Sequence, residues 1–156
     1  MRIISMLKYV ILLLTIFIAF GSGAQTAQEG FGIGIILGEP TGISFKNWLS
    51  PSTAIDGAAA WSFEGHDALH LHADYLFHND KLAKVEGGKL LFYYGLGARL
   101  KMQDHSRFGV RIPFGATYLL NASPLDFFIE IVPIMDLAPE TELEFNGGFG
   151  VRLFFK

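Results

Sequence analysis

The sequence predicts an all-β fold: an eight-stranded antiparallel up-and-down transmembrane β-barrel, preceded by a cleaved signal peptide. Three observations predict it. Segments with period-2 alternation follow one another from Gly30 to the C-terminus. Short connections containing Pro, Gly, Asn, Asp or Ser separate them, as turns require. One face of the segments is large and apolar, whereas the other mixes glycine with charge.

The composition limits the class of protein. The 156 residues suit one domain, and 51 % of them are hydrophobic while only 17 % are charged. A net charge of −3 argues against a nucleic-acid partner, which needs a basic patch. With no cysteine, disulfides, thiol catalysis and thiolate metal sites are excluded.

The N-terminus is typical of a targeting segment. Arg2 and Lys8 precede the apolar run YVILLLTIFIAF, which is short for a membrane-spanning helix. Ser22 and Ala24 then occupy the small-residue positions of a cleavage site. We expect residues 1–24 to be removed and residues 25–156 to form the barrel. The alternative is an uncleaved anchor helix.

The first four predicted strands follow in order. GFGIGIIL (30–37) alternates glycine with large apolar residues, and EPT turns the chain into GISFKNW (42–48). LSPS leads to TAIDGAAAWSF (53–63), and EGHD leads to ALHLHADYLFH (68–78). These connections are too short for a helical crossover, so neighbouring strands must be antiparallel hairpins.

Four more strands complete the count. They are KLLFYYGLGARLK (89–101), RFGVRIPFGATYLLN (107–121), LDFFIEIVPIMD (125–136) and ELEFNGGFGVRLFF (142–155). The long connection NDKLAKVEGG precedes the first of them, and it implies a ninth element, a strand extension or a different strand count. If both termini are periplasmic, this connection is periplasmic too. Pro113 and Pro133 donate no backbone hydrogen bond, so we expect a bulge or break where they face each other. The alternative is that both prolines lie near the membrane edge, where water bonds the unpaired carbonyls.

Three arguments place the apolar face outside. The interior of eight strands is just wide enough for side chains, and the Phe, Trp, Tyr and Leu face would overfill it. Thr, Ser and Gln, which are common on water-facing strands, are scarce. Buried charges need partners, and the polar face balances seven bases (Lys46, Lys89, Arg99, Lys101, Arg107, Arg111, Arg152) against seven acids (Asp56, Asp74, Asp126, Glu130, Asp136, Glu142, Glu144).

The chain resembles the small outer-membrane β-barrels of Gram-negative bacteria. The string GIILGEPTGISFKNWLSPSTAIDGAAAWSF (34–63), followed by LHLHADYLFHN (69–79) and FYYGLGARLK (92–101), looks like a family of small uncharacterised barrels. The transmembrane domain of outer-membrane protein A and outer-membrane protein X are similar in size and strand number. The resemblance implies a fold and a compartment, the outer membrane, but no reaction. Lys156 after the terminal aromatic Phe155 departs from the usual pattern.

The predicted site is an ion-pair network in the lumen, the interior of the barrel. Hairpin geometry places Asp126 near Arg152, and Arg107 and Arg111 near Asp136. Trp48 and Tyr93 also have inward parity, which the pattern does not explain. We expect the charges to plug the lumen by pairing rather than to line a pore. The predicted network is Lys46, Asp56, Arg99, Arg107, Arg111, Asp126, Glu130, Asp136, Glu144 and Arg152.

The sequence offers residues for two other kinds of site. His70, His72 and Asp74 share one face and are weak candidates for a cation site. The strand serines Ser44 and Ser62 lack a neighbouring histidine of the kind that hydrolysis requires. We therefore predict no catalytic residue and no cofactor.

The predicted protein is a monomeric structural barrel of the bacterial outer membrane. Its expected partners are membrane lipid, lipopolysaccharide and the barrel-assembly machinery, and its short loops contact envelope or host molecules. Two alternatives remain: a lipid-modifying outer-membrane enzyme, and a soluble exported barrel that binds an apolar ligand as lipocalins do.

Overall fold

A computed structural model describes residues 28–62, 68–79 and 83–155, and within these residues the chain is all-β. The predicted signal peptide and its cleavage site lie outside the described residues. No helix long and apolar enough to cross a membrane occurs in the described part. The strands are β1 (Phe31–Glu39), β2 (Thr41–Trp48), β3 (Thr53–Ser62), β4 (Ala68–Asn79), β5 (Lys84–Val85), β6 (Gly88–Met102), β7 (Arg107–Arg111), β8 (Phe114–Leu120), β9 (Leu125–Ala138) and β10 (Glu142–Phe155).

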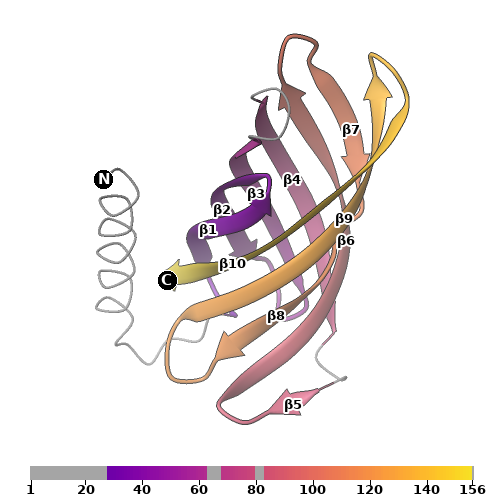
Figure 1. Cartoon of the computed structure of the whole chain (residues 1–156). Helices are drawn as coiled ribbons and strands as arrows, with labels where there is room; N and C mark the ends of the chain where they lie inside the picture. The colour runs from indigo at the N-terminus through magenta and orange to yellow at the C-terminus, as the bar shows by residue number, and fades with distance from the viewer. Residues whose placement is uncertain (1–27, 63–67, 80–82, 156) are drawn as a thin grey trace, which may run out of the picture.

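The strands form an antiparallel sheet that closes on itself (Figure 1). Most strands pair with the next along the chain, because tight turns join antiparallel neighbours. The exceptions are β4, which pairs with β6, and β7, which pairs with β6 and β9 but not with β8. The first and last strands then close the ring, with Phe31 opposite Phe155 and Glu39 opposite Gly147. Nine strands make the ring, and β5 lies off it, paired with the start of β6. No strand of the ring is left with an edge along its whole length.

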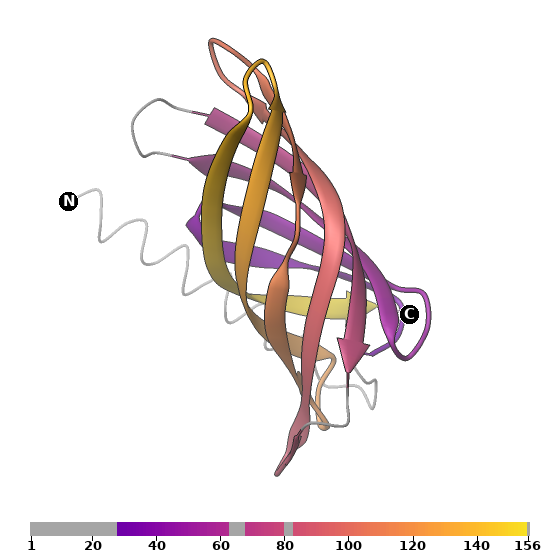
Figure 2. The same ribbon diagram turned by 90° about the vertical axis from the view of Figure 1, so that its right-hand side faces the viewer.

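The predicted segment 107–121 is divided into β7 and β8 by Ile112 and Pro113. Both parts pair with β6 on one side and β9 on the other, and they follow each other in line (Figure 2). The predicted break is therefore present, but the predicted bulge is not at the prolines. Arg111 opposite Ile134 and Phe114 opposite Ile131 keep one register across the break.

Two hydrogen bonds bridge this break. The Ile112 amide donates to the Pro133 carbonyl, and the Gly95 amide donates to the Pro113 carbonyl, both at 3.0 Å. Each proline lacks a donor but still supplies its acceptor, so the pairing continues through the missing N–H groups. The register shift in this sheet lies instead between Phe108 and Gly109.

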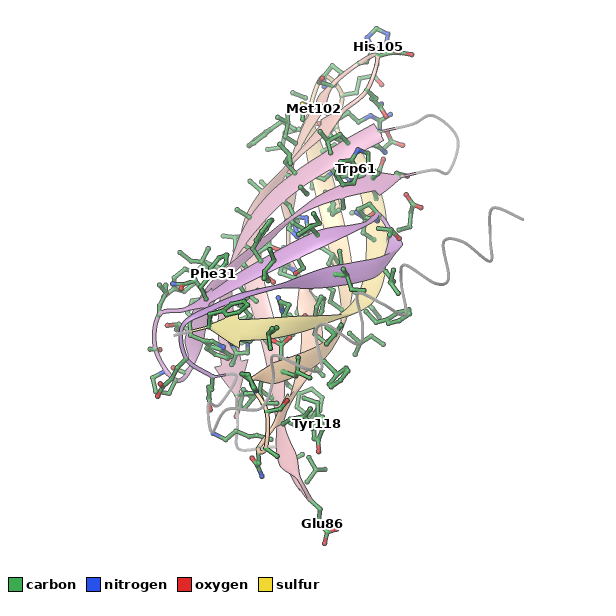
Figure 3. The ribbon with its side chains drawn as sticks, turned by 90° about the vertical axis from the view of Figure 1, so that its left-hand side faces the viewer. Phe31, Trp61, Glu86, Met102, His105 and Tyr118 are labelled. Atoms are coloured by element: carbon green, nitrogen blue, oxygen red, sulfur yellow. The ribbon has the colours of Figure 1, made fainter. Side chains whose placement is uncertain are left out.

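The long connection before β6 lies at the end of the ring where β1 begins and β10 ends. Backbone hydrogen bonds tie the turns there, from Trp48 N to Gly30 O and from Phe154 N to Pro124 O. Another joins Asn121 N to Gly87 O, which lies in the long connection. Of the alternatives for this connection, the additional element is the one observed, since β5 is a separate short strand that pairs with the start of β6. Figure 3 shows Glu86 at this end and His105 at the opposite end.

The inward and outward faces are those predicted. Along β9, Phe127, Ile129 and Ile131 are 46, 61 and 64 % exposed, while Asp126 and Asp136 are fully buried. The same alternation holds around the ring: apolar side chains stand on the outer surface, and the charged ones are enclosed. Inward glycines make room for the charges. A Cβ on Gly97 would collide with the Asp74 carboxylate, and one on Gly109 with that of Asp136.

Candidate functional site in the lumen

The lumen, the interior of the ring, is filled by charged side chains in successive clusters. Nearest the β6–β7 and β9–β10 turns, Arg99 bonds both Asp136 and Glu144, with each N–O distance at 2.7 Å. Arg107 adds bonds to Glu142 and, at 3.1 Å, to Glu144. These residues form the rim cluster: Arg99, Lys101, Arg107, Asp136, Glu142 and Glu144. Its exposure rises toward the turn, from the buried Asp136 to the half-exposed Glu142.

A middle cluster surrounds Arg111. Its guanidinium lies 2.9 Å from Asp74 and 3.4 Å from Glu130. The Tyr93 hydroxyl donates to the other Glu130 oxygen at 3.0 Å. Beside these groups a cavity of about 10 Å³ is lined by His72 and Asn146 as well as Arg111 and Glu130. Because that volume holds about one water molecule, the middle of the lumen has no room for a larger ligand.

The lower cluster is built on Arg152, whose side chain is fully buried. It donates to Asp126 at 3.0 Å and to Asp56 at 3.4 Å. Its guanidinium carbon also lies 4.0 Å from the centre of the Phe128 ring, a cation–π geometry. Two carboxylates and one aromatic face thus surround a single buried cation. An Arg in this setting keeps its charge, so the carboxylates are needed to offset the cost of burying it.

Lys46, the second cation of the lower cluster, lies in an aromatic enclosure. Its ammonium is 2.9 Å from His78 Nε2 and 3.9 Å from Asp126. The same nitrogen lies 4.3 Å from the centre of the Trp48 ring and 5.6 Å from that of Tyr93. The inward Trp48 and Tyr93, which the sequence pattern left unexplained, therefore pack around this buried cation. Aromatic faces attract an ammonium when water is excluded.

Beyond Lys46 an apolar layer closes the lumen, at the end of the ring where β1 begins and β10 ends. Its members come from five strands and are all buried: Trp48, Ala54, Leu91, Leu119 and Phe154. A second small cluster of Ile36, Ala58 and Phe128 lies inside as well. The alternation of residues predicted an inward face of glycine and charge, and this apolar layer was not predicted. Its members have the same inward parity as the charged residues, which is the signal that identifies them.

The predicted ion pairs are partly confirmed. Asp126 faces Arg152 in the β9–β10 register and bonds it, and Arg107 lies 3.6 Å from Asp136. The predicted proximity of Arg111 to Asp136 is wrong. The β7–β9 register puts Gly109 opposite Asp136, so Arg111 reaches Asp74 and Glu130 instead.

The candidate cation site does not assemble. His72 Nε2 is 4.0 Å from the nearer Asp74 oxygen, and Arg111 already pairs with that carboxylate. His70 is buried, with neither ring nitrogen hydrogen-bonded. No group of three or more metal-ligating side chains occurs within residues 28–62, 68–79 and 83–155.

Comparisons with protein-family models, with curated proteins and with solved structures found no match. The resemblance to small outer-membrane barrels therefore stays a prediction, and the proposed function rests on the lumen and the outer surface.

Proposed function

We propose that this protein is an eight-stranded transmembrane β-barrel of a bacterial outer membrane, exported by a cleaved signal peptide, with a structural role and a plugged lumen. In this count β7 and β8 are one strand, because they share both neighbours and one register. The protein works as a monomer that contacts lipid and lipopolysaccharide through its wall and envelope or host molecules through its loops. The barrel-assembly machinery inserts it.

The observation that carries the proposal is the inverted distribution of apolar and charged side chains. Phe145, Ile131 and Ile129 are 67, 64 and 61 % exposed, whereas Lys46 and Arg152 are fully buried. In water this arrangement is unfavourable for the free energy of folding in two ways, since apolar area stays hydrated and charges are desolvated. In a bilayer the same outer surface meets hydrocarbon, and the alternation is the one that membrane barrels use.

Closure of the ring supports the same proposal. A strand in hydrocarbon must satisfy its backbone groups within the sheet, because no water is present to do so. The pairing of β1 with β10 along nine residue pairs supplies the last set of these bonds. β3, β4, β6, β9 and β10 have 10 to 15 residues each, enough for a tilted membrane strand.

The filled lumen supports a structural role over conduction. Arg99, Arg111 and Arg152 each bond carboxylates from other strands, which cross-links the wall from inside. The apolar layer around Trp48 and Phe154 then excludes water at one end. An ion would have to break several buried pairs and cross this layer to pass.

The alternatives fit these observations less well. A soluble lipocalin-like barrel needs an apolar interior with room for a ligand, but here the interior is charged and closely filled. A lipid-modifying enzyme needs a nucleophile that reaches lipid. Ser44 and Ser62 are both buried on the inward face of their strands, away from the outer wall that would meet lipid.

The test is membrane fractionation followed by gel electrophoresis with and without heating. We expect the protein in the outer-membrane fraction, extracted only by detergent, with a mobility that changes when heat unfolds the barrel. Recovery in the soluble periplasmic fraction, with one mobility, would contradict the proposal. Mass spectra of lipid A from cells with and without the protein separate the structural role from the enzymatic one, and we expect identical spectra.

A further inference from the structure

The outer wall carries a hollow in its apolar surface, formed by β6, β8 and β9 on the side that faces the viewer in Figure 2. Asn79 at the end of β4 also lines it, and this residue has an interaction of its own within the protein. Its volume is about 560 Å³. Ala116 lies at its centre, opposite Phe92 on β6 and Ile129 on β9. The next outward residue of β8 is Phe114, which is 52 % exposed and stands opposite Ile131. The hollow exists because a methyl group occupies a position that large side chains surround.

The polar groups beneath the hollow are already bonded within the protein. Tyr93 and Glu130 reach it from the lumen side, where Gly115 has no side chain to cover them. The Tyr93 hydroxyl donates to one Glu130 oxygen at 3.0 Å, and Arg111 lies 3.4 Å from the other. The hollow therefore offers apolar contact without a free polar partner. A headgroup or a sugar would lose hydrogen bonds to water there, whereas a hydrocarbon chain would not.

We propose that this hollow is a binding groove for one acyl chain of a membrane lipid. The inference rests on the proposed function, since it requires the outer wall to face a bilayer. An unfilled hollow deprives the surrounding side chains of dispersion contacts. A flexible chain lying along Ala116, between Phe92 and Ile129, restores those contacts. The aromatic side chains of Phe114 and Tyr94 hold the chain at one place on the wall. Elsewhere on the apolar outer surface of the ring, called the belt below, lipid exchanges freely.

The proposal is tested by photolabelling the full-length protein in vesicles of phosphatidylethanolamine and phosphatidylglycerol that contain a fatty acid with a chain-borne diazirine. Peptide mapping then compares label on Phe92 and Ile129 with label on Leu71 and Tyr75, which lie in the belt outside the groove and are 39 and 41 % exposed. We expect several-fold more label in the groove. Ala116→Leu fills the hollow and should reduce the groove label to the level of the belt.

A matched control is Ala73→Leu, which enlarges another small outward residue, opposite Gly57 and Ala98. This variant should leave the groove label unchanged. Uniform label over the belt that Ala116→Leu does not alter overturns the groove while the membrane-spanning proposal stands. Absence of label from the whole belt overturns the membrane-spanning proposal itself. If the groove residues are protected from the photolabel in a cross-linked dimer, a second copy of the chain covers the groove. That result also overturns the acyl-chain assignment.

Discussion

Neutralising Asp126 should destabilise the protein strongly if its lumen is as dry as the structure indicates. Asp126 is fully buried and bonds Arg152 at 3.0 Å, with Lys46 3.9 Å from its other oxygen. The lower cluster holds two cations, Lys46 and Arg152, and two carboxylates, Asp126 and Asp56. Asp126→Asn keeps the shape of the side chain but leaves one positive charge without a counterpart.

The expected loss in the free energy of unfolding depends on the partners that Arg152 keeps in the variant. Removing one partner of a buried pair costs about 3–5 kcal/mol, because the other charge stays buried. Arg152 retains Asp56 at 3.4 Å and the Phe128 ring, which places the expected loss toward the lower end of that range. The free energy of unfolding is measured by urea titration in phospholipid vesicles, with tryptophan fluorescence as the signal.

The control replaces the whole pair. In Asp126→Leu combined with Arg152→Met, no charge is left uncompensated, because Lys46 keeps Asp56 as the remaining carboxylate of the cluster. We expect this double variant to be more stable than Asp126→Asn, since apolar replacement of a complete buried pair is often neutral. A loss below about 0.5 kcal/mol for Asp126→Asn is the size expected of a surface substitution. That result would refute the placement of these charges in a dry interior.

Three further predictions follow from the same structure. Phe149, which is 57 % exposed on the outer wall, should lose about 2–4 kcal/mol of stability in a bilayer on substitution by Arg; a spin label at position 149 that reports water would contradict this. In planar bilayers the native protein should not conduct, whereas Trp48→Ala combined with Phe154→Ala removes the apolar layer and should admit water and raise ion leakage; the outward Phe155→Ala is the control, and an unchanged baseline in the double variant would show that the layer is not the seal. N-terminal sequencing of the envelope-derived protein should start at Gln25, and a start at Met1 would exclude cleavage.

The faces of the strands could be predicted from the sequence because strand geometry has a fixed period of two. Once the alternation of Phe127, Ile129 and Ile131 with Asp126 and Glu130 is recognised, every residue of β9 has a side. Volume then decides which side is inward, since the interior of so small a ring cannot hold the whole face of Phe, Trp, Tyr and Leu. The same rule assigned Trp48 and Tyr93 to the interior, although it could not say what they pack against.

Most of the partners inside the lumen were decided by the tertiary structure. The pair of Asp126 with Arg152 was predictable, because these residues lie on neighbouring strands joined by a short turn. Arg111 was misassigned because its partners come from two strands, Asp74 on β4 and Glu130 on β9. The β7–β9 register alone does not select them, since β4 is not a neighbour of β7 in the sheet.

Lys46 depends on closure of the ring in the same way. Its contacts come from β4 through His78, from β6 through Tyr93 and from β9 through Asp126. These strands are not its neighbours in the sheet, so no hairpin rule brings them together. The sequence by itself determined that a buried cation must stand at position 46 and need partners. Only the curvature of the closed sheet, which turns inward side chains of distant strands toward one axis, decided which residues those partners are.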